Sequence, residues 1–106
     1  MSTDPKTIEL LLDRLTDAGD VTARKMFGEY GLYCDGVFIG VVCDDNFHIK
    51  PTKQTADMTA DLEMAPAYDG ARPSPLIPPE SWDDSDWLVE LVRTTALALA
   101  RKSKKK

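Results

Sequence analysis

Residues 24–40, with the sequence RKMFGEYGLYCDGVFIG, constrain the fold of this chain more than any other stretch. Four glycines lie among aromatic and aliphatic residues, and Asp35-Gly36 separates two runs of strand-forming residues. Asp-Gly is typical of a two-residue hairpin turn, because such turns need the positive φ angles that glycine tolerates. A phosphate-binding loop would instead lead directly into a helix, and no helical pattern follows these glycines. We therefore predict two antiparallel strands.

The hairpin extends on both sides into a predicted antiparallel meander. Alternation of side chains predicts a strand from residue 21 to 27, and further strands over 30–34 and 37–43. Asp45-Asn46 is the next turn signal, and it leads into a short fourth strand over 47–50. Short connections between successive strands are characteristic of an antiparallel sheet.

Two glycines are predicted to face each other in the first hairpin. A two-residue turn at Asp35-Gly36 pairs positions whose numbers sum to 71, so Gly31 should oppose Gly40. Two missing side chains would form a notch in the sheet, and we expect a helix or an aromatic ring to fill it.

Helices are predicted at both ends of the chain, which defines an α+β fold: an antiparallel β-meander flanked by an N-terminal helix and a long C-terminal helix. Asp4-Pro5 is a helix start, and helical spacing continues to residue 18. The last helix is predicted over 86–102. Between them we expect a short helix over 52–62 and one edge strand at 75–77, with prolines protecting the edge.

Length and charge predict one domain over residues 1–106 with an acidic body. The net charge is −5, but the last six residues contribute five positive charges. Residues 1–100 therefore carry 8 basic and 18 acidic side chains, a balance of −10, which repels phosphate backbones. Direct nucleic-acid binding is expected only weakly, through a disordered tail whose basic residues are Arg101, Lys102, Lys104, Lys105 and Lys106.

The sequence predicts no targeting peptide and no membrane-spanning segment. The start, MSTDPKTIELL, has no basic region followed by an apolar one, and no stretch approaches the ~20 apolar residues of a span. We expect a cytoplasmic protein, a monomer or a homodimer, in which Cys34 and Cys43 remain thiols. We also expect no cofactor.

Cys43 and His48 are the candidates for chemistry. A turn at Asp45-Asn46 would make Cys43 oppose His48, and a thiolate beside an imidazole can begin a metal site or a nucleophilic pair. The alternative function is therefore a small metal- or thiol-dependent enzyme. We favour two buried cysteines and a strand histidine without catalysis, because neither a third group nor the four ligands of structural zinc are in evidence.

Aromatic residues follow the predicted strands. Aromatic rings interleaved with basic residues can stack bases, but a domain of this size needs rings for its core, and we favour that interpretation. The set comprises Phe27, Tyr30, Tyr33, Phe38 and Phe47.

The strand region combines an Arg-x-Met-Phe-Gly strand, a following Gly-x-Tyr, a hairpin at Asp-Gly and a strand ending in lysine. This combination resembles the N-terminal domain of the TfoX (Sxy) competence-regulator family. The matching residues are Arg24, Met26, Phe27, Gly28, Tyr30, Gly31, Leu32, Tyr33, Asp35, Gly36 and Lys50. The later stretch MAPAYDGARPSPLIPPE before a long helix is also similar to the family.

The resemblance implies an α+β domain without established catalytic residues. Some members add a C-terminal helical domain and regulate transcription of competence genes together with the cyclic-AMP receptor protein; we expect that second domain to be absent here. The implied function is a non-catalytic interaction module with a protein partner. The implied interaction patch comprises Met26, Phe27, Gly28, Tyr30 and Gly31.

Overall fold

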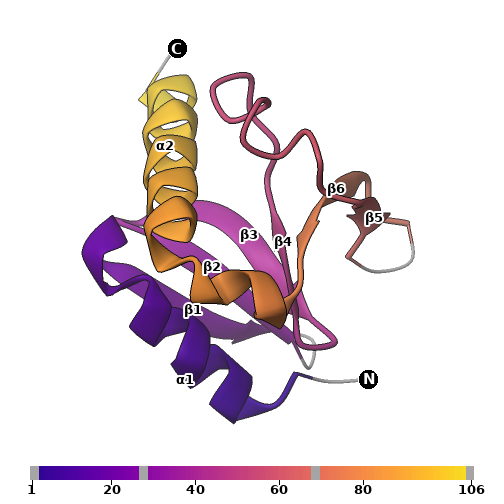
Figure 1. Ribbon diagram of the computed structural model, residues 1–106. Helices are drawn as coiled ribbons and strands as arrows, with labels where there is room; N and C mark the ends of the chain where they lie inside the picture. Colours follow the sequence, from indigo (N-terminus) through magenta and orange to yellow (C-terminus); the bar gives the residue numbers. More distant parts are fainter. Residues whose placement is uncertain (1–2, 27–28, 68–69, 105–106) are drawn as a thin grey trace.

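The structure is a computed structural model that describes residues 3–26, 29–67 and 70–104 (Figure 1). One six-stranded sheet has the strand order β1-β2-β3-β4-β6-β5, and every neighbouring pair is antiparallel. The elements in chain order are α1 (Pro5–Arg14), a 3₁₀ turn (Thr16–Ala18), β1 (Val21–Met26), β2 (Glu29–Cys34), β3 (Val37–Cys43), β4 (Asn46–Ile49), β5 (Met64–Pro66), β6 (Pro73–Ile77), a second 3₁₀ turn (Pro79–Asp83) and α2 (Ser85–Lys104). The α+β prediction and the four-strand meander are confirmed.

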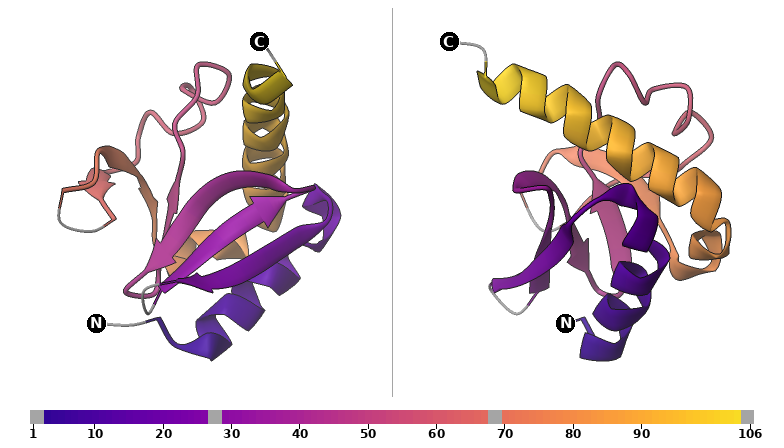
Figure 2. Two further views of the ribbon diagram at one scale, coloured as in Figure 1. Left: turned by 180° about the vertical axis from the view of Figure 1, so that it is seen from behind. Right: turned by 90° about the vertical axis from the view of Figure 1, so that its left-hand side faces the viewer.

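Both α-helices cover the same face of strands β1 to β3 (Figure 2). The buried core lies between these layers and includes Leu11 of α1, Ile39 of β3 and Leu91 of α2, all fully buried. The opposite face of these three strands carries no helix (Figure 2). Within the described ranges, neither α-helix combines the length and the apolar character required of a transmembrane segment.

The N-terminal helix begins as predicted but ends early. The Asp4 carboxylate accepts a hydrogen bond from the Lys6 backbone N–H at 2.9 Å, and Pro5 occupies the first helical position. A single helix to residue 18 was predicted, yet α1 stops at Arg14 and a 3₁₀ turn follows. The Thr16 hydroxyl donates to the Asp13 carbonyl at 2.8 Å, which is the local competition by which threonine weakens a helix.

The first hairpin turns where predicted, but its register shifts by one residue. Asp35 and Gly36 both have positive φ, 52° and 84°, as a type I′ turn requires. Beyond Tyr33 a bulge shifts the pairing, so that Gly40 faces Leu32 rather than Gly31. The predicted pairing of the two glycines is therefore wrong.

Gly40 nevertheless has a steric role. A Cβ at this position would overlap the backbone carbonyl oxygen of His48 and would lie 3.1 Å from the Phe47 ring. The missing side chain therefore accommodates the close approach of β4. A helix or a ring alone was expected to fill the notch, but the neighbouring backbone occupies most of it.

The second hairpin turns one residue earlier than predicted. Asp44 and Asp45 have φ angles of 55° and 65°, so they form the turn. Cys43 consequently faces Asn46, and His48 faces Val41. Aspartate adopts the left-handed conformation more readily than most residues, which explains why two aspartates can replace the Asp45-Asn46 turn.

The prediction of a short helix over 52–62 is wrong for residues 51–63. They form successive turns, in which the Thr55 N–H bonds to the Thr52 hydroxyl at 3.1 Å and the Thr59 hydroxyl bonds to the Thr55 carbonyl at 3.2 Å. Hydroxyl groups that bond the nearby backbone offer it an alternative to helical hydrogen bonds. A helix also needs a continuous run of favourable residues to offset its nucleation cost.

The predicted edge strand exists but lies inside the sheet. β6 pairs with β4 through Leu76 and Ile77, and with β5 through the residues from Pro73 to Pro75. The edge is instead β5, which was not predicted. Proline lacks the N–H that a ladder on both sides would need, and the proline-rich half of β6 pairs on one side only.

The C-terminal helix is close to its prediction. Asp84 caps it, with its carboxylate accepting from the Trp87 N–H at 3.3 Å, and Ser85 begins the helix. Just before it, Trp82 is fully buried and donates its indole N–H to the Ile77 carbonyl at 3.2 Å. This hydrogen bond connects the entry of α2 to the end of β6.

Candidate functional site

Four side chains form a continuous row, the sheet-face ladder, made of Arg24, Tyr33, Phe38 and Lys50. The Arg24 guanidinium lies 5.7 Å from the Tyr33 ring centroid, and the Lys50 ammonium lies 5.0 Å from the Phe38 ring centroid. The two rings lie 5.3 Å apart at an angle of 50°. Each end of the row is therefore a cation over an aromatic face, an arrangement worth about 0.5–1 kcal/mol at exposed sites.

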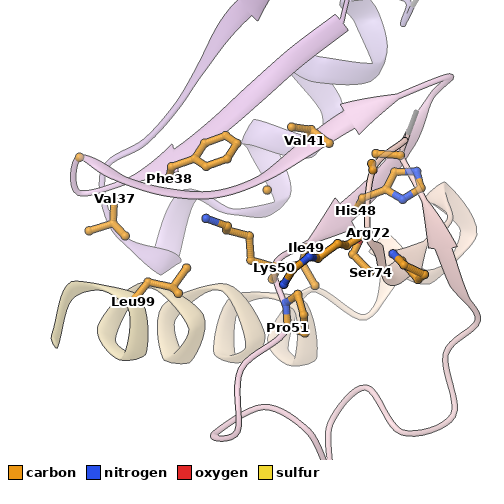
Figure 3. A pocket seen from close by; sticks show the side chains of 15 residues that line it. Val37, Phe38, Val41, His48, Ile49, Lys50, Pro51, Arg72, Ser74 and Leu99 are labelled. Carbon is orange, nitrogen blue, oxygen red and sulfur yellow. The ribbon is translucent and has the colours of Figure 1, made fainter. Parts of the chain in front are cut away.

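The strand register produces this row. Tyr33 faces Phe38 directly, and Arg24 faces Gly31, two residues from Tyr33 on the same face. Because Gly31 has no side chain, the arginine can lean toward the tyrosine ring. Both rings are partly exposed and lie outside the core cluster. Figure 3 shows Phe38 directed away from α2, whereas Val37 points toward Leu99 of that helix.

A hollow of about 880 Å³ opens beside the Lys50 end of the ladder (Figure 3). β4 ends at Ile49, and the proline half of β6 has no β4 partner, so the two strands separate there. The walls combine apolar and polar side chains from β3, β4, the loop before β6, β6 and α2. The residues that matter for its chemistry are Phe38, Val41, His48, Lys50, Arg72 and Ser74.

The charge of the hollow differs from that of the whole chain. Lys50 and Arg72 belong to its lining, and none of the described lining residues is Asp or Glu. The chain nevertheless carries 18 acidic residues and a net charge of −5. The hollow is therefore a locally basic region on an acidic protein.

His48 is a buried member of the hollow wall. Its side chain is 7% exposed, and burial lowers the pKa of the imidazole below 6.5, with a partial opposing effect from the nearby backbone of Ala65. The ring is therefore neutral at pH 7. Its Nδ1 atom has no hydrogen-bond partner among the described residues.

The predicted pairing of Cys43 with His48 is wrong. The two residues lie on the same sheet face but diagonally, because His48 faces Val41 and Cys43 faces Asn46. Burial, followed by the charges of Glu29 and Asp44, raises the pKa of the Cys43 thiol. A nucleophilic thiolate requires the opposite shift. In the part of the chain that the structure describes, no three His, Cys, Asp or Glu side chains gather as a metal site.

The predicted interaction patch is only partly within the described structure. Phe27 and Gly28 lie outside the described residues, as does the side chain of Met26. Tyr30 packs against the core cluster and Gly31 is buried. The patch stays a prediction.

The aromatic set divides between the two sheet faces. Phe47 is fully buried, as expected of a core ring, and Tyr30 packs against the core. Tyr33 and Phe38 were expected there too, yet they lie on the opposite face. Counting the alternation outward from the Asp35-Gly36 turn would have separated these rings, because facing residues share one side of a sheet.

The fold and site define a small α+β domain with one helix-covered sheet face and one open face. The family model described as the TfoX N-terminal domain matches residues 13–99, so the chain belongs to the TfoX N-terminal domain family. A protein from Spirochaeta aurantia, described as an uncharacterized 12.7 kDa protein in the trpE 5′ region, is also similar. It is 30% identical over 99 residues, which cover 93% of this chain and 85% of that protein.

Proposed function

We propose that the chain is a non-catalytic regulatory module that acts on transcription, including that of competence genes, by binding a protein partner in the cytoplasm. The observation that carries this proposal is the sheet-face ladder. It presents Arg24 and Tyr33 on a face that the helices leave open. Arginine and tyrosine are among the residues that contribute most to protein–protein binding.

The ladder also favours one kind of partner surface. Its two ends are cationic, and Arg24 and Lys50 are both exposed. Carboxylates on the partner would complement them, while the acidic remainder of the chain would disfavour other orientations. The rings between them are already ordered by their mutual contact, which reduces the entropy lost on binding.

The enzyme alternative has less support. Cys43 and His48 do not face each other, and burial holds the cysteine as a neutral thiol. Membership of the TfoX N-terminal domain family adds support for a role outside catalysis.

Affinity capture with paired variants tests the proposal. The full chain is tagged and compared with an Arg24→Glu/Tyr33→Ala variant and with Lys6→Glu, a charge reversal at an exposed position of α1. We expect the wild-type chain and Lys6→Glu to capture the same transcription component, and the ladder variant to capture it about tenfold less well. Circular dichroism checks that all three proteins are folded.

Two outcomes contradict the proposal. One is equal capture of that component by the ladder variant and the control. The other is capture by the ladder surface of proteins whose loss leaves transcript levels unchanged in the cell.

Contact with nucleic acid is proposed only as a weak contribution of the basic tail. Deletion of residues 101–106 should then remove a small affinity for DNA that is visible at low salt and disappears as salt rises. An affinity that survives this deletion would place the contact on the folded domain instead.

A further inference from the structure

The hollow beside the sheet-face ladder has the charge expected of an anion site. Its cationic side chains, Lys50 and Arg72, come from separate segments of the chain and line one space. The Lys50 ammonium is held against the Phe38 ring. Both ion pairs found between described residues involve Arg14, so neither lining cation is neutralised by a described carboxylate.

The size and the walls of the hollow fit a small organic molecule. A volume of about 880 Å³ falls in the range of ligand sites, roughly 300–1,000 Å³. Phe38, Val41 and Leu99 provide apolar surface, and Ser74 adds a hydroxyl group to the lining. Apolar walls with a few polar groups are typical of such sites.

His48 provides a third, independent observation. It lines the hollow, it is 93% buried since its exposure is 7%, and its Nδ1 atom is unpaired among the described residues. Buried polar atoms in folded proteins are rarely left without a partner. Because this atom is not open to solvent, a polar atom of a molecule in the hollow would become its partner only after the imidazole ring turns toward the hollow.

We propose that this hollow binds a small organic anion, a carboxylate or phosphate group carried on a planar apolar body. Lys50 and Arg72 attract the anionic group, since arginine and lysine are the side chains that form charge-assisted hydrogen bonds to carboxylates and phosphates. The apolar body lies against Phe38 and Val41. The hollow shares Phe38 and Lys50 with the ladder but not Arg24 or Tyr33, so the Arg24→Glu/Tyr33→Ala variant tests partner binding without replacing a lining residue.

Titration of the full chain, followed by ¹H–¹⁵N NMR, tests the site directly. The probes are benzoate and phenyl phosphate, each compared with a neutral counterpart, benzamide and benzyl alcohol. We expect saturable shifts of the backbone signals of Phe38, Lys50 and Ser74 at millimolar concentrations, as is usual for ligands of this size. Saturation by benzoate alone identifies a carboxylate site, by phenyl phosphate alone a phosphate site, and by both a general anion site.

A matched pair of lysine variants then assigns the charge. Lys50→Met keeps the apolar stem of the side chain, and Lys53→Met makes the same change at an exposed position outside the lining. Affinity for the anionic probe should fall about tenfold in Lys50→Met and in Arg72→Met, and less than about twofold in Lys53→Met. Circular dichroism and the undisturbed part of the NMR spectrum confirm that each variant is folded.

Three results would overturn the proposal. They are the absence of saturable shifts with either anion, equal binding of charged and neutral probes, and equal loss of affinity in Lys50→Met and Lys53→Met. None of them bears on the capture experiment with Arg24 and Tyr33.

Discussion

Two regions of one sheet differ in how their structure arises. Strands β1 to β4, which lie within residues 21–26 and 29–49, form an antiparallel meander whose two described turns contain two residues each. Residues 51–77 contribute β5 and β6 after a series of threonine-rich turns, and β6 returns to pair with β4. The first region depends on contacts between neighbours in the sequence. The second depends on a surface that the first must provide.

This difference shows which strand pairings can be predicted from residues that are close in the sequence. A tight turn closes a hairpin at low entropic cost, and it fixes which residues face each other. Phe47 meets Ile77 only after a long intervening segment has been ordered, and both side chains are fully buried at that contact. Long-range pairing of this kind is stabilised by the core, because the entropy of closure must be offset by burial.

The largest expected effect is a difference in stability between alanine substitutions at two glycines of the meander. Gly40→Ala should destabilise the chain by about 3 kcal/mol, because the added Cβ meets the backbone of His48, which has little freedom to move. Gly36→Ala meets no atom within 4 Å and is opposed only by its φ of 84°, so about 1 kcal/mol is expected. Urea unfolding measures both, and equal losses would show that β4 can yield at Gly40.

The next effect concerns the contact that joins the second region to the core. Trp82→Phe removes the hydrogen bond to the Ile77 carbonyl and leaves a small cavity, so we expect a loss of about 2–3 kcal/mol. Trp87→Phe, at a partly exposed position, should cost less than about 1 kcal/mol. Hydrogen exchange should accelerate more in β6 than in β2. Equal acceleration in both strands would mean that the two regions unfold as one unit.

A smaller effect tests the threonine-rich turns. Thr55 is 1% exposed, and its hydroxyl lies 2.7 Å from that of Thr52. Thr55→Val should therefore cost about 1 kcal/mol in the free energy of unfolding. Thr22→Val, on an exposed position of β1, should change it by less than about 0.5 kcal/mol. A neutral or stabilising Thr55→Val would show that these turns do not depend on the hydroxyl.

The smallest effect is a pH dependence centred on the boundary between the regions, where β4 carries the only histidine. Burial lowers the folded-state pKa of His48 below 6.5, so the unfolded chain binds the proton more tightly. The free energy of unfolding should therefore decrease as pH falls through 6.5 and level off below the lowered folded pKa. His48→Gln should lack this component, and identical pH profiles for the two proteins would contradict the burial of a neutral ring.

Sequence reasoning found the elements more easily than the site. The Asp4-Pro5 helix start and the Asp35-Gly36 turn are specified by the residues at those positions, and both predictions are confirmed. Cys43 and His48 were selected because one turn was placed a residue late, and that shift changed which residues face each other. The hollow was not predicted, because its lining residues come from segments whose proximity depends on how β6 pairs.

By itself, the sequence determined the meander, the terminal helices and the acidic body with its basic tail, because turns, caps and charge act over a few residues. Only the tertiary structure decided that Gly40 faces Leu32, that β6 enters the sheet, and that Lys50 and Arg72 share a hollow. A single-residue bulge and a proline-limited strand produce these outcomes. Their effect depends on which backbone lies alongside, and that is fixed only when the whole core is packed.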